Sequence, residues 1–185
     1  MISYSLRIAR SLLGLVFLMP YCALAEKADS TKPINVEAEQ FVYDSAKLVK
    51  TISGNVVLTR GTLTMKAEKV ILKEDAAGNQ FVTLLAPAGG LATFRQKRDG
   101  GDFWVEGQAE RIEYDSHAEI VKLFTRAKLK RFDGVRPTDE VAGALISYDS
   151  RSEFFTVNNS QAGVKTDPNE RVKIVIQPPI DAKAK

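Results

Sequence analysis

Apolar and polar residues alternate along most of the chain. Ile34, Val36 and Ala38 alternate with polar neighbours, and the same period of two recurs over residues 62 to 67 and 103 to 109. This is the period of a β-strand with one buried face, and short turns rich in glycine, asparagine and aspartate separate such segments. Beyond the N-terminal segment, no window of eleven or more residues carries a helical apolar stripe. Because connections this short cannot cross between parallel strands, the pattern predicts an all-β, antiparallel domain.

One eight-residue phrase occurs in several copies. Residues 38 to 45 spell AEQFVYDS, residues 109 to 116 spell AERIEYDS, residues 143 to 150 spell GALISYDS, and a shorter copy begins at Ala67. In each copy a small residue is followed three positions later by an apolar one. A step of three in a period of two needs a bulge or a bend, which a small side chain permits. The repeat therefore predicts strands that all bend at the same place.

A stack of bent strands makes an antiparallel sheet folded into two layers that face each other across an apolar interior. Two hypotheses about this interior stay open: a sandwich core filled by its own side chains, or a slot that is only partly closed. Small residues at the bends favour the slot, as do the tyrosines after them, which need a wet end. The residues predicted to line the interior are Ile34, Val36, Phe41, Tyr43, Leu63, Met65, Phe94, Val105, Ile112, Tyr114 and Tyr148.

The N-terminal segment has the pattern of a secretory signal peptide. Arg7 and Arg10 precede an apolar run, and small residues up to Ala25 provide a cleavage site. The run is shorter than the roughly 20 residues that a membrane-spanning helix needs, and Pro20 interrupts it. The only cysteine, Cys22, lies in this segment, so the mature domain must hold together by packing. The expected division is a signal peptide (1–25), a flexible N-terminus (26–32), the folded all-β domain (33–177) and a disordered charged tail (178–185).

Charge and side-chain chemistry exclude several classes of function. The chain has 26 Lys and Arg against 23 Asp and Glu, and without Arg7 and Arg10 of the signal peptide the balance is 24 to 23. This near-neutral balance, with no basic and aromatic stripe, argues against nucleic-acid binding. The single histidine, His117, follows Asp115 and Ser116 in a turn, where adjacent positions cannot form a catalytic triad. One histidine without cysteine also argues against a zinc site, so we expect no enzyme, no metal and no cofactor.

Five short stretches have a specific combined order and spacing. They are residues 33 to 39 (PINVEAE), 53 to 63 (SGNVVLTRGTL), 67 to 70 (AEKV), and 92 to 94 (ATF) followed by 105 to 109 (VEGQA). In this order they resemble the OstA-like family of periplasmic lipopolysaccharide transport proteins. The similarity runs from about Pro33 to Val157, and the chain after Asn158 matches only loosely.

The resemblance implies a fold, a bent antiparallel β-jelly roll over residues 33–177 with an apolar interior slot, together with a function and a set of partners. Members of that family form a bent jelly-roll slot that takes up the acyl chains of lipopolysaccharide, and they stack head to tail between the two membranes. The implied partners in the periplasm are lipopolysaccharide, the inner-membrane transport complex with its membrane-tethered jelly roll, the jelly roll of the outer-membrane translocon, and further copies of the chain. The resemblance places Ile34, Val36, Phe94 and Tyr114 in the slot, four residues that the repeat already predicts.

Both ends of the domain carry strand-like segments, at residues 34 to 38 and 171 to 176. As open sheet edges they would support head-to-tail stacking of copies. Alternatively, the second segment pairs within its own sheet, where Pro178 and Pro179 blunt the edge. A secreted β-sandwich binding or structural module with a fully packed core remains the second hypothesis for the whole chain.

Two groups of charged residues also have two interpretations each. Arg95, Lys97 and Arg98 are candidate contacts for the phosphates of lipid A, or else form a solvated hairpin face. The aspartates at the ends of the repeats, such as Asp44 and Asp149, are interpreted as turn residues rather than calcium ligands, because Asp-Ser pairs favour turns.

Overall fold

The computed structural model describes residue 29 and residues 32–161, 164–165 and 171–178. These residues form one large antiparallel sheet and a separate two-stranded one. Among them there is no helix long and apolar enough to cross a membrane. The strands are β1 (Asn35–Glu37), β2 (Gln40–Asp44), β3 (Val49–Arg60), β4 (Leu63–Glu74), β5 (Gln80–Leu85), β6 (Ala92–Arg98), β7 (Phe103–Ala109), β8 (Arg111–Asp115), β9 (Ile120–Asp133), β10 (Arg136–Asp149), β11 (Phe154–Asn158), β12 (Ser160–Gln161), β13 (Val164–Lys165) and β14 (Lys173–Ile176).

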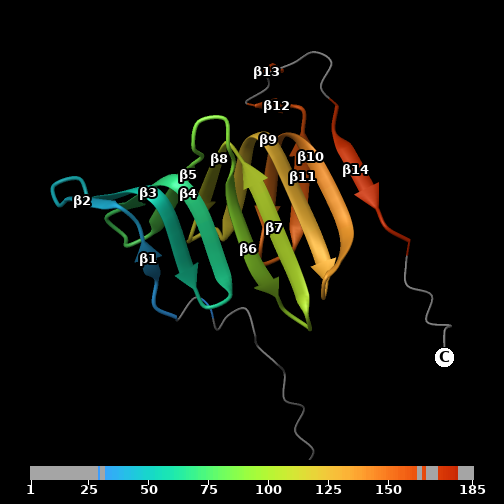
Figure 1. Ribbon diagram of the computed structural model, residues 1–185, viewed down its shortest axis with the longest axis horizontal. Coiled ribbons are helices and arrows are strands. Elements are labelled where there is room, and N and C mark those ends of the chain that lie inside the picture. The colour runs from blue at the N-terminus through green and yellow to red at the C-terminus, as the bar shows by residue number, and fades with distance from the viewer. Residues whose placement is uncertain (1–28, 30–31, 162–163, 166–170, 179–185) are drawn as a thin grey trace, which may run out of the picture.

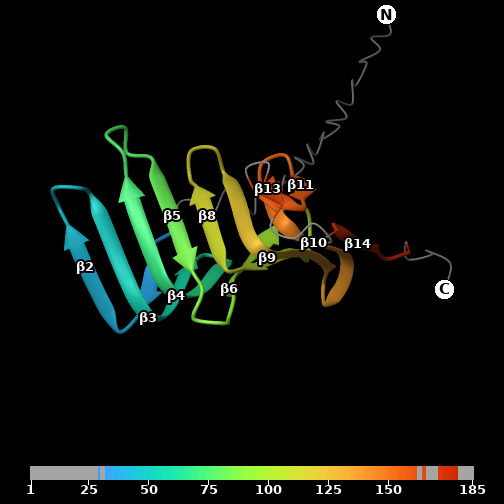
Figure 2. The ribbon, with the colours of Figure 1, turned by 90° about the horizontal axis from the view of Figure 1, so that it is seen from above.

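The large sheet folds into two layers because four long strands, β3, β4, β9 and β10, run through both (Figure 1). The front layer of Figure 1 has the order β1, β3, β4, β6, β7, β9, β10, β14. The rear layer has the order β2, β3, β4, β5, β8, β9, β10, β11. Figure 2 shows the turns of three rear-layer hairpins, β2–β3, β4–β5 and β8–β9, in one row. The predicted bent antiparallel jelly roll is confirmed.

The long strands bend where they pass from one layer to the other. The register of β3 against β4 shifts between Ser53 and Val56, and that of β10 against β9 shifts between Gly143 and Leu145. In β9 the bend falls at Thr125, which has a positive φ of 63°. The breaks between β1 and β2 and between β7 and β8 lie at the same level, so the repeat's predicted bends are confirmed.

The repeated glutamate holds the bend of the neighbouring strand. The N–H of Glu39 donates to the carbonyl of Ser53 at 3.2 Å, and the Glu39 carboxylate accepts a bond from Asn55 Nδ2 at 2.8 Å. In the third copy, the Glu110 carboxylate accepts a bond from Arg126 Nε at 2.7 Å. Asn55 and Arg126 both have positive φ, a conformation that non-glycine residues avoid unless their surroundings fix it. In the first and third copies, the Ala-Glu start of the phrase therefore stabilises the strained corner beside it.

The repeated aspartate closes the turns of the rear layer. Asp115 Oδ1 accepts bonds from the N–H groups of His117 and Ala118 at 2.9 and 3.0 Å. Asp44 and Asp149 each accept the same pair of backbone bonds in their own turns. These carboxylates hold turns, as the Asp-Ser pattern predicts.

The packed core lies between the layers and follows the bend. Its inward positions step by two along each half-strand and by three across the bend, for example from Ala109 to Ile112 in β7 and β8. The small side chains of Ala92, Ala109 and Ala127 are completely or almost completely buried, so the two layers approach closely there. Burying one aliphatic side chain contributes roughly 1.5–3 kcal/mol. The fully buried large side chains include Leu84, Ile112, Leu123, Leu129, Ile146 and Tyr148.

Candidate functional site: a cavity between the layers

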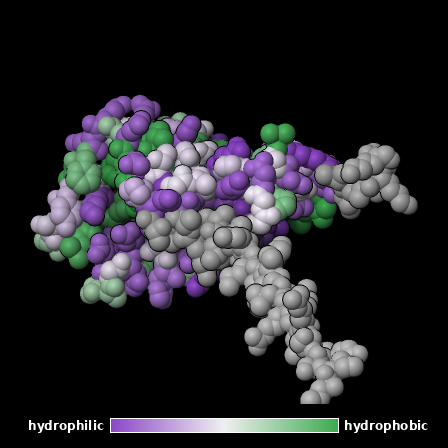
Figure 3. Space-filling model, turned by 90° about the horizontal axis from the view of Figure 1, so that it is seen from below, coloured by the Kyte–Doolittle hydropathy of each residue, from purple (hydrophilic) through white to green (hydrophobic). Residues whose placement is uncertain are grey.

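A cavity of about 680 Å³ lies between the two layers, on the side away from the bend. Its apolar lining comes from both layers: Leu63, Met65 and Phe94 from the front layer, and Tyr114 and Val121 from the rear layer. Its volume is within the roughly 300–1,000 Å³ typical of ligand pockets. Figure 3 views the molecule from the side on which the front-layer turns lie. On that side, hydrophobic residues gather toward the β1–β2 end among hydrophilic ones.

The rim of this cavity is polar and carries charges of both signs. Arg151 lies on the rear rim, where its Nη2 donates to the carbonyl of Ala118 at 2.6 Å. Asp29 lies on the front rim, where its Oδ2 accepts a bond from the N–H of Thr62 at 3.0 Å. An apolar floor beneath a polar rim suits an amphipathic guest. The other polar rim residues are Arg60, Gln80, Gln96, Asp99, Ser116, Glu119 and Ser150.

Tyr114 is the one aromatic side chain that the rear layer contributes to the cavity lining within the described part of the chain. Burial raises the pKa of its phenol above 10.0, and the nearby Glu119 carboxylate adds to the shift. The hydroxyl therefore stays protonated and neutral across the physiological range. Tyr114 presents an apolar ring and a neutral hydrogen-bonding group to a guest.

The structure divides the eleven predicted interior residues into three groups. Leu63, Met65, Phe94 and Tyr114 line the cavity, and two of them, Met65 and Phe94, are also buried members of the packed core. Val105, Ile112 and Tyr148 are almost completely buried in the packed core. Ile34, Val36, Phe41 and Tyr43 are exposed on β2 and along β1, at the N-terminal end of the sheet. Whether any of them binds a lipid stays a prediction.

An ion pair joins the two layers beside the cavity, toward the C-terminal end of the sheet. Arg98, the last residue of β6 in the front layer, donates from Nε to Glu153 Oε1 at 3.0 Å and from Nη2 to the other carboxylate oxygen. Glu153 lies in the β10–β11 turn of the rear layer. Arg131 of β9 donates from Nη2 to the Glu153 carbonyl at 2.6 Å, and its guanidinium lies 4.8 Å from the ring centre of Phe155. We call Arg98, Arg131 and Glu153 the interlayer clasp.

The three basic residues predicted to contact phosphate do not form one cluster. Arg98 points inward and belongs to the interlayer clasp, with only 14% of its side chain exposed. Arg95 and Lys97 lie on the outer face, where both contact the ring of Trp104, at 4.4 and 5.9 Å from its centre. Strand alternation separates Arg98 from the other two. Whether they meet phosphate stays a prediction.

The two ends of the sheet leave edge strands whose outer sides are unpaired among the described residues. At one end these are β1 in the front layer and β2 in the rear layer, and Phe41 of β2 is 61% exposed. At the other end they are β14 and β11, and Ile176 of β14 is 75% exposed. The structure therefore supports the interpretation that the last strand pairs within its own sheet, since β14 is hydrogen-bonded to β10, while its second edge stays open.

Among the described residues, no group of three or more His, Cys, Asp or Glu side chains is placed to hold a metal ion. The predicted signal peptide at 1–25 and most of the predicted tail lie outside the described residues, so the predicted domain boundaries stay predictions. Sequence reasoning missed the clasp and most of the polar rim. The inward parity that Arg98 shares with Phe94 was the available signal for the clasp.

Comparison with known proteins finds relatives that are named as lipopolysaccharide transport or export proteins. The family model for the LptA/(LptD N-terminal domain) LPS transport protein matches residues 35–154. The chain is 32% identical to the lipopolysaccharide export system protein LptA of Haemophilus influenzae, over 78% of this chain and 81% of that protein. It is 30% identical to LptA of Escherichia coli K12, over 84% of this chain and 77% of that protein.

A solved structure agrees with these relatives. It is the crystal structure of LptH from Pseudomonas aeruginosa, described as the LptA homologous periplasmic component of the conserved lipopolysaccharide transport device. The two structures superpose with a TM-score of 0.70 at 27% sequence identity, covering 81% of this chain and 99% of that one. The similarity therefore extends to the arrangement of the strands.

Proposed function

Because the chain belongs to the LptA/LptD N-terminal domain family of lipopolysaccharide transport proteins, we propose that it binds lipopolysaccharide through its acyl chains in the interlayer cavity. The observation that carries this proposal is the cavity itself, with an apolar floor from both layers beneath a polar rim. The acyl chains of lipid A would lie on the floor, and the sugar head group would stay at the rim. Leu63, Met65, Phe94 and Tyr114 would contact the chains directly.

The physical need for such a cavity follows from the cost of exposing hydrocarbon. Each buried CH₂ is worth about 0.8 kcal/mol, so an acyl chain of about a dozen carbons would lose on the order of 10 kcal/mol in water. A carrier crossing an aqueous gap must therefore cover the chain throughout. Transfer between two similar cavities is nearly neutral in free energy, so the direction must come from a partner.

Site-specific photocrosslinking tests the proposal. A photoreactive side chain at Tyr114, inside the cavity, is expected to capture acylated lipopolysaccharide. The matched control is Lys122, which is exposed on the outer face of the same layer, and it is expected to capture none. Capture at Lys122 and none at Tyr114 would favour the second hypothesis, a β-sandwich module with a filled core.

We also propose that copies stack head to tail, joining their cavities into a bridge across the periplasm. Uncovered apolar residues lie at both ends: Phe41 and Tyr43 on the rear layer at one end, and at the other Ile174 and Ile176 on the front layer with Phe154 on the rear layer. Ile34 and Val36 of β1 add to the first end. Such ends can overlap, and unpaired strand edges can pair with each other. A heterologous contact of this kind extends without closing.

Light scattering against concentration tests the stacking. The apparent mass is expected to rise with concentration, and Ile176→Asp is expected to keep the protein monomeric by placing a charge in the contact. Val135→Asp is the matched control, because Val135 is 97% exposed in a front-layer turn away from either edge. Equal masses for both variants at every concentration would contradict the proposal.

The proposed compartment and partners follow from the family. LptH is described as a periplasmic component, and the predicted signal peptide would send this chain to the same place. One end of the stack would meet the membrane-tethered jelly roll of the inner-membrane transport complex. The other end would meet the jelly roll of the outer-membrane translocon. Each contact would use the same edge pairing as the contact between copies.

A further inference from the structure

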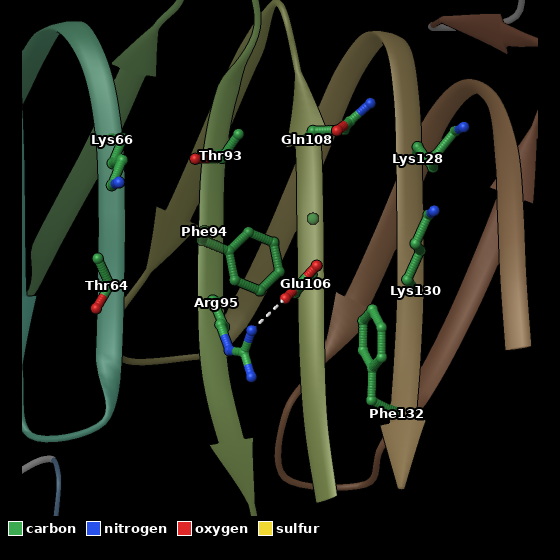
Figure 4. A pocket seen from close by; sticks show the side chains of 11 residues that line it. Thr64, Lys66, Thr93, Phe94, Arg95, Glu106, Gln108, Lys128, Lys130 and Phe132 are labelled. Atoms are coloured by element: carbon green, nitrogen blue, oxygen red, sulfur yellow. Dashed lines mark hydrogen bonds and ion pairs between the residues drawn. The ribbon is translucent and has the colours of Figure 1, made fainter. Parts of the chain in front are cut away.

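A second hollow, of about 450 Å³, lies on the outer face of the front layer (Figure 4). It crosses four neighbouring strands, β4, β6, β7 and β9, on the face opposite to the cavity between the layers. Most of its side chains alternate with those that point into the core, and the hollow also meets two inward-facing positions, Phe94 and Gly107. We call this hollow the outer groove.

The strand register arranges the outer groove in two rows. In the first row, Lys66 pairs with Thr93, Thr93 with Gln108, and Gln108 with Lys128. Neighbouring strands lie about 4.8 Å apart, so the two lysines are roughly 14 Å apart along the row. This row has a cation at each end, neutral hydrogen-bonding groups between them, and no carboxylate.

The second row consists of Thr64, Arg95, Glu106 and Lys130, and it gives the groove its remaining charge. Arg95 donates to Glu106 at 2.8 Å, and Lys128 and Lys130 both contact Glu140, at 2.9 and 3.0 Å. The two lysines lower the pKa of Glu140, so this carboxylate is ionised at neutral pH. Four cations, including Lys66, are thus matched by two carboxylates, and within the described part of the chain Lys66 has no ion-pair partner. The groove keeps a local excess of positive charge.

The shape and chemistry of the groove identify a class of ligand. Arg95 is held between Glu106 and the ring of Trp104, which fixes its guanidinium in place at the groove. Fixed guanidinium and ammonium groups suit phosphate, whereas Thr93 and Gln108 suit the hydroxyl groups of a sugar. The hollow is too local for a long polyanion, and the overall charge of the chain is nearly balanced. A short saccharide that carries phosphate fits both rows.

We propose that the outer groove is a second binding site, which takes a short phosphorylated saccharide such as the sugar head group of the lipopolysaccharide whose acyl chains lie in the cavity. The part of this inference that links the groove to lipopolysaccharide rests on the proposed function. The groove approaches the front-layer turns, because Thr64 and Phe132 are both within two residues of a turn. A head group leaving the cavity rim would reach it by passing over these turns.

Titration with a deacylated probe tests the site separately from the cavity. The probe is the phosphorylated oligosaccharide released from lipopolysaccharide by removing its acyl chains, measured by calorimetry on the full mature chain. Lys66→Gln and Lys128→Gln are each expected to weaken binding about tenfold, the value of one charge-assisted hydrogen bond. Lys122→Gln is the matched control, since Lys122 lies on β9 like Lys128 but on the rear layer, and it should bind as the parent does.

Three comparisons decide the outcome. Enzymatic removal of the phosphates from the probe is expected to abolish the difference between the parent and the variants. Equal binding by parent, Lys66→Gln and Lys128→Gln overturns the site. Binding of inorganic phosphate or a polyglutamate peptide as tight as that of the probe overturns the assignment to a saccharide. Thermal melting of each variant shows whether it is folded.

Crosslinking at Tyr114 distinguishes failure of this inference from failure of the proposed function. If Tyr114 captures acylated lipopolysaccharide equally in the parent and in Lys66→Gln while the probe does not bind, the groove proposal fails and the cavity proposal stands. If the probe binds but Tyr114 captures nothing, the cavity proposal fails and the link to the cargo fails with it.

Discussion

The interior near the bend and the interior near the rim are made by the same repeat but differ in packing. In the third copy, Ile112 is completely buried, whereas Tyr114, two residues later on the same face of β8, lines the cavity. The difference arises because the two layers meet at the bend and separate toward their turns. One set of inward positions thus provides a solid core that holds the fold and a lining that can receive a guest.

Small side chains determine where the packed interior near the bend ends. Ala92 and Ala109 are paired across β6 and β7 and are completely buried, so the layers are in close contact at that level. Gly107, one step further along, makes room within the front layer itself, because a Cβ there would lie 2.1 Å from Cε1 of Phe94 on the neighbouring strand. Beyond this point the front layer contributes the larger Leu63 and Met65, and the cavity begins. The stability of the fold and the capacity for a guest should therefore respond to different substitutions.

The largest expected effect is on the packed side of this comparison. Ile112→Ala removes a completely buried side chain beside the bend and should lower the free energy of unfolding by about 2–5 kcal/mol, as buried aliphatic truncations do. Urea unfolding measures it. The control is Tyr114→Phe, which removes only a hydroxyl at the cavity and should cost far less. A loss below about 1 kcal/mol for Ile112→Ala would mean that the bend is not a packed core.

The next effect concerns the interlayer clasp, which keeps the two layers together beside the cavity. Glu153→Gln leaves the mostly buried Arg98 without its carboxylate and should lower the free energy of unfolding by about 1–3 kcal/mol. The opened rim should also increase lipid capture at Tyr114.

Lys97→Gln is the control for the clasp. It breaks the 3.7 Å contact between Lys97 and Asp102 on the solvent side, and exposed pairs contribute roughly 0–1 kcal/mol. If the Glu153→Gln variant has the same unfolding free energy and the same lipid capture at Tyr114 as the parent, the clasp does not hold the layers together.

On the rim side, a substitution should have a smaller effect on stability. Its main effect should be on the amount of lipid that the cavity can hold. Leu63→Trp places a larger side chain in the cavity, which has room for it, so the free energy of unfolding should change by less than about 1 kcal/mol. Lipid capture at Tyr114 should fall severalfold. Unchanged capture, with the stability also unchanged, would indicate that acyl chains do not occupy this part of the interior.

The sequence predicted more of the fold than of the site, for a physical reason. The period of two, the step of three at Ala67, Ala109 and Gly143, and the turn aspartates are local signals, and each appears in the structure as predicted. The position of an inward residue relative to the opposite layer is not local. Alternation places Ile112 and Tyr114 on one face, but only the separation of the layers decides which of them packs and which lines a cavity.

The same limit applies to charged residues. Arg95 and Arg98 are three residues apart on one hairpin, and in the sequence they belong to one basic group. The partner of Arg98 is Glu153, which is 55 residues away in a turn of the other layer. The partners of Arg95 are Glu106 and Trp104 on the adjacent strand. Alternation along β6 indicates that Arg98 points inward like Phe94, but only the pairing of β6 and β7 and the fold of the sheet bring each arginine to its partners.

The smallest expected effect is on acid stability, and it arises in the rear-layer turns outside the packed core. The Asp75 and Asp149 carboxylates accept hydrogen bonds in rear-layer turns, from Asn79 and from Ser152 respectively, and these bonds lower both pKa values below 3.8. A lowered pKa in the folded state stabilises the fold above the unfolded pKa. That stabilisation is lost as the pH falls from about 4 through the folded values. Asp75→Asn with Asp149→Asn should therefore flatten the decline of the unfolding free energy with acid, measured by urea unfolding between pH 3 and 6. Ile112→Ala should lower the whole curve and keep its slope, and an unflattened decline in the double variant would place the acid sensitivity elsewhere than in these turns.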